Sequence, residues 1–434
     1  MEKVFVIVTQ CLITFAAAQI SNEILPPGAL KASELIALDT ILPNDLNFTE
    51  LLENLGSNHH SHTRFDVVQI IKSYNYSVET HTVQTEDGYI LELNRITGRI
   101  DKPSPKVKQA VLLQHGLLCS SMDWVLAGPK KGLGFILSDI GYDVWLGNVR
   151  GSRYSRKHNH YTVEEAKYWN FDWHEIGLYD LPTMIDYILI ETGHKKLFYI
   201  GHSQGSTAFF VMASLLPEYN DKIHAMFSLA PIAFCSRMFS PVFQFLSRII
   251  KPVNLVANFI GLYEFKPSDA FFTKFVTELC QDNSALQPIC MNAIFLITGF
   301  NWDQFDTSLL PAIISNVPAG ASVRQFIHYA QIIKSGYFVQ YDHGLWGNIQ
   351  KYGKVGPPTY NLKNVKAPVS LHYSINDWLS HPNDVQSLYS KLPNPIGKFR
   401  VVHDNFNHLD YLWAKDVKIL LYNKIISIML RYKD

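Results

Sequence analysis

Short apolar runs recur between residues 110 and 402, and most are separated by stretches with the spacing of helices. Runs that are apolar at consecutive positions are typical of strands buried on both faces of a sheet. Their alternation with helices predicts an α/β fold with a mainly parallel sheet. The predicted strands are residues 110–113, 144–146, 197–200, 226–230, 369–373 and 399–402.

A different pattern precedes these runs. Apolar or β-branched residues alternate with polar ones on both sides of the tripeptide 86–88, Glu-Asp-Gly, which is typical of a turn. Alternation on both sides of a turn predicts an antiparallel hairpin. The alternating residues are Val78, Thr80 and Thr82 before the turn, and Tyr89, Leu91 and Leu93 after it.

One helix can be placed closely from its ends. Asp180 is the expected N-cap, Pro182 lies in the first turn, and Gly193 is the expected stop. The expected apolar face consists of Met184, Ile185, Ile188 and Ile190.

The strand pattern lapses between residues 233 and 360, where Phe, Ile and Leu recur with helix-like spacing. A stretch of this length is too long for a loop. We expect a mainly helical subdomain, inserted as a cap with a lid over the active edge of the sheet. The core would then consist of residues 63–232 and 361–434.

Composition and charge narrow the class of protein. The chain has 434 residues, of which 47% are hydrophobic and 18% charged, and 38 basic residues balance 38 acidic ones. These values are typical of a globular protein with a large core. They give no indication of nucleic acid as a partner. The oligomeric state stays open.

The N-terminus has the pattern of a signal peptide, residues 1–18. A charged start is followed by an apolar run that ends in three alanines, and it is shorter than the roughly 20 residues that a spanning helix needs. No later stretch predicts a transmembrane segment, so we expect a secreted or lysosomal protein. Residues 19–62 lack a strong period, and we interpret them as a lead segment that could be removed as a pro-region.

The secretory route makes glycosylation and disulfides relevant. Asn47 and Asn75 each begin an Asn-X-Ser/Thr sequon. Of five cysteines, four lie outside the signal peptide. An oxidising compartment favours a local disulfide between Cys280 and Cys290. Cys119 and Cys235 could be buried free thiols or could form a second disulfide, and the sequence does not distinguish these two possibilities.

The main chemical motif is GHSQG at residues 201–205. It follows the predicted strand 197–200 and precedes an apolar stretch, so strand, sharp turn and helix succeed one another as a nucleophile elbow requires. Glycines two residues before and after Ser203 fit a strained, closely packed turn. Ser203 is therefore the candidate nucleophile.

Acyl transfer also needs backbone donors for the oxyanion. The segment QHGLL at residues 114–118 directly follows the strand 110–113, where an α/β-hydrolase offers one such N–H group. Gln204, the residue after the candidate nucleophile, would offer the other.

An acid and a histidine should follow in that order, each just beyond a strand. Asp377 follows the strand 369–373. His408 is favoured over His403, because His403 is expected to end the strand 399–402 whereas His408 lies on the loop beyond it. Asp404 and Asp410 are nearby, and we expect them to be solvated or helix-capping carboxylates. This chemistry requires no cofactor or metal.

With these residues in view, the chain resembles the animal acid lipases, the group of gastric lipase, lysosomal acid lipase and insect relatives. The resemblance implies an α/β-hydrolase fold, a helical cap with a mobile lid, hydrolysis of neutral lipid esters and tolerance of acid pH. The matching segments are TEDGYIL at 85–91, QHGLL at 114–118, GYDVWLGN at 141–148, GHSQG at 201–205, PAGAS at 318–322 and NHLD at 407–410.

Carried over by position, the resemblance implies a catalytic triad of Ser203, Asp377 and His408. It also implies oxyanion N–H groups from Leu117 and Gln204, and a cap disulfide at Cys280 and Cys290. The chain departs from the family pattern at Cys119 and Cys235, and at Ser374-Ile375, where a glycine-rich approach to the acid is usual.

The leading hypothesis is a lipase that hydrolyses triacylglycerols or sterol esters at a lipid–water interface through an acyl-enzyme on Ser203. Two alternatives are a catalytically inactive lipase-fold protein that binds lipid, and a carboxylesterase for soluble substrates. The intact set of three catalytic residue types argues against the inactive protein.

Overall fold

A computed structural model describes residues 66–102, 108–248, 262–266 and 294–432. The chain divides into two compact units, Met1–Arg64 and Phe65–Asp434, and the described residues belong to the second. Several predictions concern residues outside these ranges. They are the signal peptide 1–18, the lead segment 19–62, the sequon at Asn47 and the pairing of Cys280 with Cys290.

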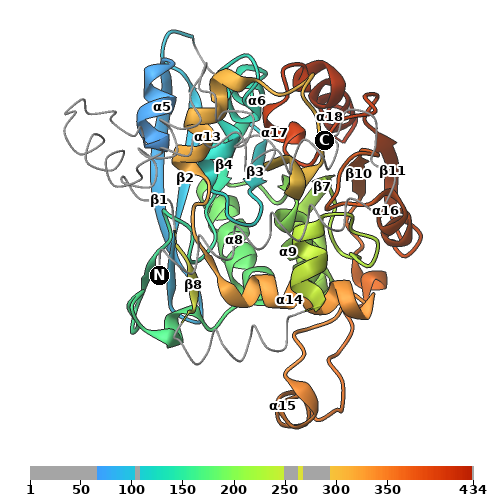
Figure 1. The fold of residues 1–434 in the computed structure, drawn as a ribbon. Coiled ribbons are helices and arrows are strands. Elements are labelled where there is room, and N and C mark those ends of the chain that lie inside the picture. The colour runs from blue at the N-terminus through green and yellow to red at the C-terminus, as the bar shows by residue number, and fades with distance from the viewer. Residues whose placement is uncertain (1–65, 103–107, 249–261, 267–293, 433–434) are drawn as a thin grey trace, which may run out of the picture. The chain divides into compact units, whose positions relative to one another are not determined.

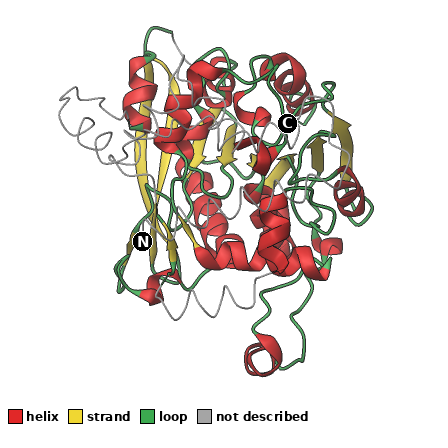
Figure 2. Cartoon of the chain, viewed as in Figure 1, coloured by secondary structure: helices red, strands yellow, loops and turns green. Residues whose placement is uncertain are grey.

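A nine-stranded sheet runs through the described unit (Figures 1 and 2). Its order is β1-β2-β4-β3-β6-β7-β10-β11, and β5 also pairs with β2. The pairs from β4 to β11 are all parallel, whereas β2 runs antiparallel to β1, β4 and β5. The strands are β1 (Tyr76–Gln84), β2 (Tyr89–Arg99), β3 (Ala110–Gln114), β4 (Asp143–Gly147), β5 (Lys157–His158), β6 (Leu197–His202), β7 (Ile223–Leu229), β10 (Val369–Tyr373) and β11 (Pro395–Arg400).

The predicted hairpin and five of the predicted buried strands are confirmed, whereas the sixth strand, β11, is only partly buried and is shifted along the chain. The two arms of the hairpin are β1 and β2, and the apolar runs correspond to β3, β4, β6, β7, β10 and β11. Strand β11 begins and ends earlier than residues 399–402, the range expected from the sequence. The sequence predicted that His403 ends this strand, and that prediction is wrong, because β11 ends at Arg400 and His403 lies beyond it.

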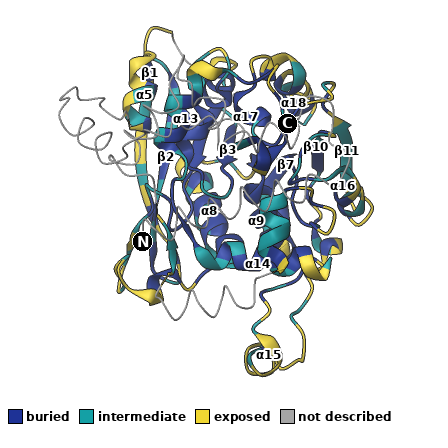
Figure 3. Cartoon of the chain, in the orientation of Figure 1, coloured by how far each residue is buried: buried dark blue, intermediate teal, exposed yellow. Residues whose placement is uncertain are grey.

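The central strands are buried on both faces because their successive side chains enter two different cores. Along β3, Ala110 and Leu112 belong to one core, and Val111 and Leu113 belong to the other. Helices α8 and α9 contribute to the first core, and helices α5, α6 and α18 to the second. Figure 3 shows the central strands in the colour of buried residues.

The helices that surround the sheet are mostly short. They are α5 (Val67–Ser73), α6 (Leu133–Asp139), α7 (Trp173–Glu175), α8 (Leu181–Thr192), α9 (Gln204–Leu215), α16 (Pro382–Tyr389), α17 (Asp410–Trp413) and α18 (Asn423–Met429).

The predicted helix 181–192 is present, but Asp180 is not its cap. Residues Ile176–Asp180 form a π-helical turn that joins α7 to α8, so Asp180 has helical torsion angles and caps nothing. Its carboxylate binds Arg150 instead. Gly193 ends the helix in the left-handed conformation, as predicted. The expected apolar face is buried except for Ile190, which points to solvent.

The segment 233–360 contains helices in its described parts, as expected. They include α13 (Leu310–Asn316), α14 (Val323–Ser335) and α15 (Gly344–Tyr352), together with a two-stranded sheet of β8 (Glu264–Phe265) and β9 (Ala321–Ser322). Its assignment as a cap with a lid stays a prediction. Within the described ranges, no helix has the length and apolar character needed to cross a membrane.

Candidate active site

Ser203 lies at a sharp turn between β6 and α9. Its φ of 53° and ψ of −118° are rare for a residue with a side chain, and such strain persists only when the surroundings impose it. The backbone N–H of Ser203 donates to Leu229 O at 2.9 Å, and Ser203 O accepts from Ser206 N at 2.9 Å. The turn is thus held by the neighbouring strand and by the helix that it starts.

The two glycines of the motif are required by contact between backbones. A Cβ atom on Gly205 would lie 2.4 Å from Gln114 O, and one on Gly201 would lie 2.8 Å from the carbonyl carbon of Gly205. No side chain fits at such distances. The glycine frame therefore lets α9 start directly against the end of β3.

Asp377 and His408 form a buried pair next to this turn. His408 Nδ1 lies 2.9 Å from both carboxylate oxygens of Asp377. One of these oxygens also accepts from the backbone N–H groups of Leu379 and Ser380, at 2.9 and 2.8 Å. The carboxylate is therefore held on one side by its own loop and on the other by the imidazole.

The nearby residues that the sequence left as competitors have other partners. Asp377 pairs with His408 and not with His403. Asp404 is exposed and pairs with Arg400. Asp410 is buried and accepts from the Asn301 side chain at 2.6 Å and from Asn407 N at 2.7 Å. Burial raises the pKa of Asp410 to about 7.

The turn after β3 is shaped by His115. Val149 N donates to His115 Nε2 at 3.2 Å, so the proton is on Nδ1, which donates to Gly116 O at 2.8 Å. Burial lowers the pKa of His115 to about 4, which keeps this neutral tautomer in mildly acid solution. A Cβ atom on Gly116 would lie 3.1 Å from Ser203 Cβ, so glycine leaves the nucleophile uncrowded.

The two predicted oxyanion donors lie next to Gly116 and Ser203 in the sequence. Leu117 follows Gly116 in the turn after β3, and Gln204 is the first residue of α9. Within the described part of the chain, neither backbone N–H has a hydrogen-bond acceptor. Both groups are available to a ligand oxygen.

Comparison with known proteins agrees with this geometry. A model described as "alpha/beta hydrolase fold" matches residues 109–415, and one described as "Partial alpha/beta-hydrolase lipase region" matches residues 67–128. Lipase 1 of Drosophila melanogaster is 42% identical over 84% of this chain and 79% of that protein. The chain belongs to the acid lipase family.

Two mammalian members of the family are also similar to this lipase. Human lysosomal acid lipase/cholesteryl ester hydrolase is 38% identical over 86% of this chain and 92% of that protein. Bovine gastric triacylglycerol lipase is 38% identical over 84% of this chain and 91% of that protein. Among solved structures, a Sulfolobus solfataricus protein has the same fold, with a TM-score of 0.56 and 11% identity, and the match covers 83% of this chain and 95% of that one.

The lipase has two cysteines in its described part, and both are buried free thiols. They are Cys119 and Cys235, and they form no disulfide with each other. Of the two possibilities that the sequence left open, the structure therefore shows the free thiols. Asn75, the predicted glycosylation site inside the described ranges, is exposed between α5 and β1.

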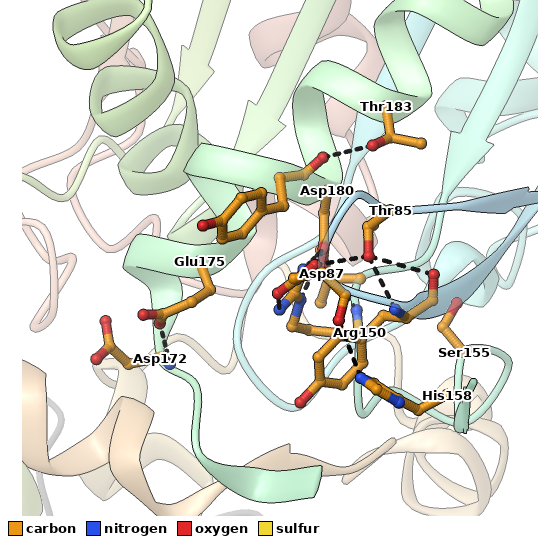
Figure 4. A network of polar contacts seen from close by, with 12 residues as sticks. Thr85, Asp87, Arg150, Ser155, His158, Asp172, Glu175, Asp180 and Thr183 are labelled. Atoms are coloured by element: carbon orange, nitrogen blue, oxygen red, sulfur yellow. Dashed lines mark hydrogen bonds and ion pairs between the residues drawn. The ribbon is translucent and has the colours of Figure 1, made fainter. Parts of the chain in front are cut away.

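A buried ion network that no sequence pattern indicated joins the TEDGYIL segment at 85–91 to Arg150 and Asp180 (Figure 4). The guanidinium of Arg150 is fully buried and donates to Asp180 at 2.7 Å and to Asp87 at 2.6 and 2.8 Å. It also lies 3.9 Å from the centre of the Tyr89 ring. The hairpin turn, the loop after β4 and the start of α8 are thus tied together by one cation.

A second buried network connects α14 to the core through Asp172. His328 Nδ1 lies 2.7 Å from Asp172 Oδ1, and Arg324 Nε donates to Asp172 Oδ2 at 3.1 Å. The His328 ring stacks on Trp173 at 3.6 Å. Burial, reinforced by the charge of Asp172, raises the pKa of Glu175 to about 7. No local sequence pattern indicated this network, because its members come from segments far apart in the chain.

Proposed function

We propose that this protein is a serine lipase that hydrolyses carboxylic ester bonds of neutral lipids through an acyl-enzyme on Ser203. The observation that carries the proposal is the buried pair of His408 and Asp377 beside a strained serine turn. A histidine oriented by a buried carboxylate next to such a serine is the arrangement that activates a hydroxyl for acyl transfer.

Acylation begins when Ser203 Oγ attacks the ester carbonyl carbon and its proton passes to His408 Nε2. Asp377, bound to Nδ1, keeps the tautomer that leaves Nε2 free and stabilises the imidazolium. Collapse of the tetrahedral intermediate breaks the bond to the alcohol, which takes the proton from His408. Water then attacks the acyl-enzyme by the same route, and the fatty acid leaves.

The negative charge that develops on the carbonyl oxygen would be bound by the N–H groups of Leu117 and Gln204. Both groups lack an acceptor among the described residues, and both belong to segments held rigidly by backbone contacts. Donors arranged in advance contribute large rate factors, because they need no reorganisation during the reaction.

The substrate class follows from the relatives. One is named a triacylglycerol lipase and another a cholesteryl ester hydrolase, so we propose neutral lipids of these two kinds, presented at a lipid–water interface. The same relatives support a secreted or lysosomal location. In that setting residues 233–360 would act as the cap, Cys280 and Cys290 would form a disulfide, and Asn47 and Asn75 would be glycosylated.

A fluorophosphonate probe tests the nucleophile. The mature protein should be labelled, and Ser203→Ala should abolish labelling and ester hydrolysis while the melting temperature stays close to that of the wild type. Labelling that persists in Ser203→Ala would overturn the assignment of Ser203. Absence of labelling in the wild type would favour the inactive lipid-binding protein.

A comparison of substrates tests the lipase assignment. A lipase hydrolyses an emulsion of long-chain triacylglycerol or sterol ester, whereas a soluble-substrate carboxylesterase hydrolyses a short-chain soluble ester alone. Activity restricted to the short ester would refute the lipase proposal and leave the serine mechanism intact.

A further inference from the structure

The side chain of Gln204 is held by a residue from the inserted segment. Gln204 Nε2 donates to Gln325 Oε1 at 2.6 Å, and both side chains are buried. Gln204 Oε1 has no hydrogen-bond partner in the described structure. The contact with Gln325 is therefore the one polar restraint on the Gln204 side chain among the described residues.

Gln325 is itself fixed, because α14 is anchored to the core on both sides of it. Before Gln325, Ser322 Oγ donates to Trp169 O at 2.8 Å. After it, the Tyr329 hydroxyl lies 3.0 Å from Thr207 Oγ1, and Thr207 belongs to the first turn of α9. Helix α14 therefore contacts the helix that Gln204 begins, and it keeps Gln325 at a fixed place beside the nucleophile turn.

The hydrogen bond to Gln325 adds a side-chain restraint to the backbone contacts that hold the nucleophile turn. Ser203 has a backbone conformation that is rare for a residue with a side chain, so the chain that leads into Gln204 is under local strain. That peptide carries the Gln204 N–H. A hydrogen bond that fixes the side chain of Gln204 also restricts the rotation of its backbone, and so restricts the direction of this N–H.

We propose that Gln325 is a positioning residue for ester hydrolysis, which aims the Gln204 N–H at the oxyanion by holding the Gln204 side chain. The proposal rests on the proposed function, in which Gln204 is an oxyanion donor. It makes the inserted segment part of the catalytic machinery as well as a cover for the substrate.

The test compares three variants of the mature protein on a short soluble ester. Gln325→Leu removes the acceptor and should lower kcat by about tenfold with little change in KM, because a small misalignment weakens transition-state binding. Gln325→Glu keeps an acceptor oxygen and should restore most of kcat. Gln331→Ala is the control: Gln331 is a half-buried glutamine of the same helix, bound to Asp342, and its loss should leave kcat unchanged.

A transition-state analogue separates positioning from a general loss of structure. An alkyl trifluoromethyl ketone forms a hemiketal with Ser203 whose oxyanion occupies the same site. Its Ki should rise in Gln325→Leu by the same factor as kcat/KM falls. A folded Gln325→Leu protein with unchanged kcat and Ki would overturn the proposal, as would a loss of kcat without any change in Ki.

Gln204→Leu removes the same hydrogen bond from the other side and keeps the backbone N–H. It should lower kcat about as much as Gln325→Leu, and the double variant should be no worse than either single one, since both remove one contact. Independent effects that multiply in the double variant would contradict the proposal. If Gln325→Leu does not fold, normal kcat and Ki in Gln204→Leu would overturn it.

Ser203→Ala distinguishes this inference from the proposed function. Full activity in Ser203→Ala would overturn both the proposed function and the inference about Gln325. Loss of activity in Ser203→Ala with normal kinetics in Gln325→Leu would overturn the inference alone.

Discussion

His202 Nε2 lies 2.9 Å from the backbone oxygen of His408, and the two imidazole rings are 4.9 Å apart. Burial, with a contribution from the nearby His408, holds the pKa of His202 well below its usual value, so His202 stays neutral. Since Nε2 faces an acceptor, it carries the proton and donates. The residue before the candidate nucleophile thus holds the loop that carries the candidate base.

Replacement of His202 tests this link. His202→Leu should lower kcat/KM by about tenfold and the stability by about 1 kcal/mol, because a buried hydrogen bond is lost and His408 is less well placed. His202→Gln, whose amide can still donate, should retain more activity. Kinetics on a soluble ester and urea unfolding measure both effects. Equal losses of kcat/KM in the two variants would contradict a role for the donated hydrogen bond.

Asp377→Asn should leave the protein folded and lower kcat by about four orders of magnitude. The amide keeps an oxygen for the N–H groups of Leu379 and Ser380, but it no longer stabilises the imidazolium. Asp404→Asn is the control, since Asp404 is exposed and pairs with Arg400 instead of His408. Similar kcat values for the two variants would show that Asp377 has no catalytic role.

Arg150→Met should destabilise the fold by about 3–5 kcal/mol, because it leaves Asp180 buried without its cation. Arg150→Lys should recover little of the lost stability, since an ammonium cannot reproduce the forked contacts of a guanidinium to two carboxylates. Arg400→Met removes an exposed ion pair with Asp404 and should cost less than about 1 kcal/mol. Urea unfolding of the three variants measures the difference. Comparable costs for Arg150→Met and Arg400→Met would refute a structural role for the network.

Glu175 should make the fold less stable as the pH rises. Its folded-state pKa of about 7 exceeds the ordinary value of 4.5, so the folded state holds a proton that the unfolded state has lost between these values. The stabilisation is full below about pH 4.5 and is lost as the pH approaches 7. Glu175→Gln should therefore be more stable than the wild type by about 2 kcal/mol at pH 7.5, and the gap should close near pH 4.5.

Melting temperatures between pH 4 and 8 check this expectation. Other buried groups act on the wild-type slope in both directions, since burial raises the pKa of Asp123 and Asp410 to about 7 and lowers that of His115 to about 4. The quantity that reports on Glu175 is therefore the difference between the wild type and Glu175→Gln. A gap between the wild type and Glu175→Gln that stays constant with pH would contradict the prediction.

The sequence predicted those parts of the fold that local patterns determine. Strands such as β3 and β6 are buried on both faces, and their apolar runs are therefore continuous. The nucleophile turn could be found because it depends on five consecutive residues. The order of acid and histidine along the chain then indicated Asp377 and His408, which the structure brings together at 2.9 Å.

The rest depended on contacts between distant segments. Asp180 has the residue type of a helix cap, but a cation 30 residues away determines its role. Strand β11 contains Lys398 and Arg400 at the edge of the sheet, so its apolar run is a poor guide to its bounds. The pairing of Gln204 with Gln325 joins residues 121 positions apart, and no spacing rule indicates such a contact.

The close approach of Gly205 to Gln114 has a consequence for thermal inactivation. Because two main chains touch there without an intervening side chain, peptide geometry sets the gap between the nucleophile turn and the turn after β3. Loosened side-chain packing elsewhere in the core does not widen that gap. Heating should therefore leave the specific activity of the remaining folded molecules constant, and the loss of activity should coincide with the cooperative melting of the whole unit.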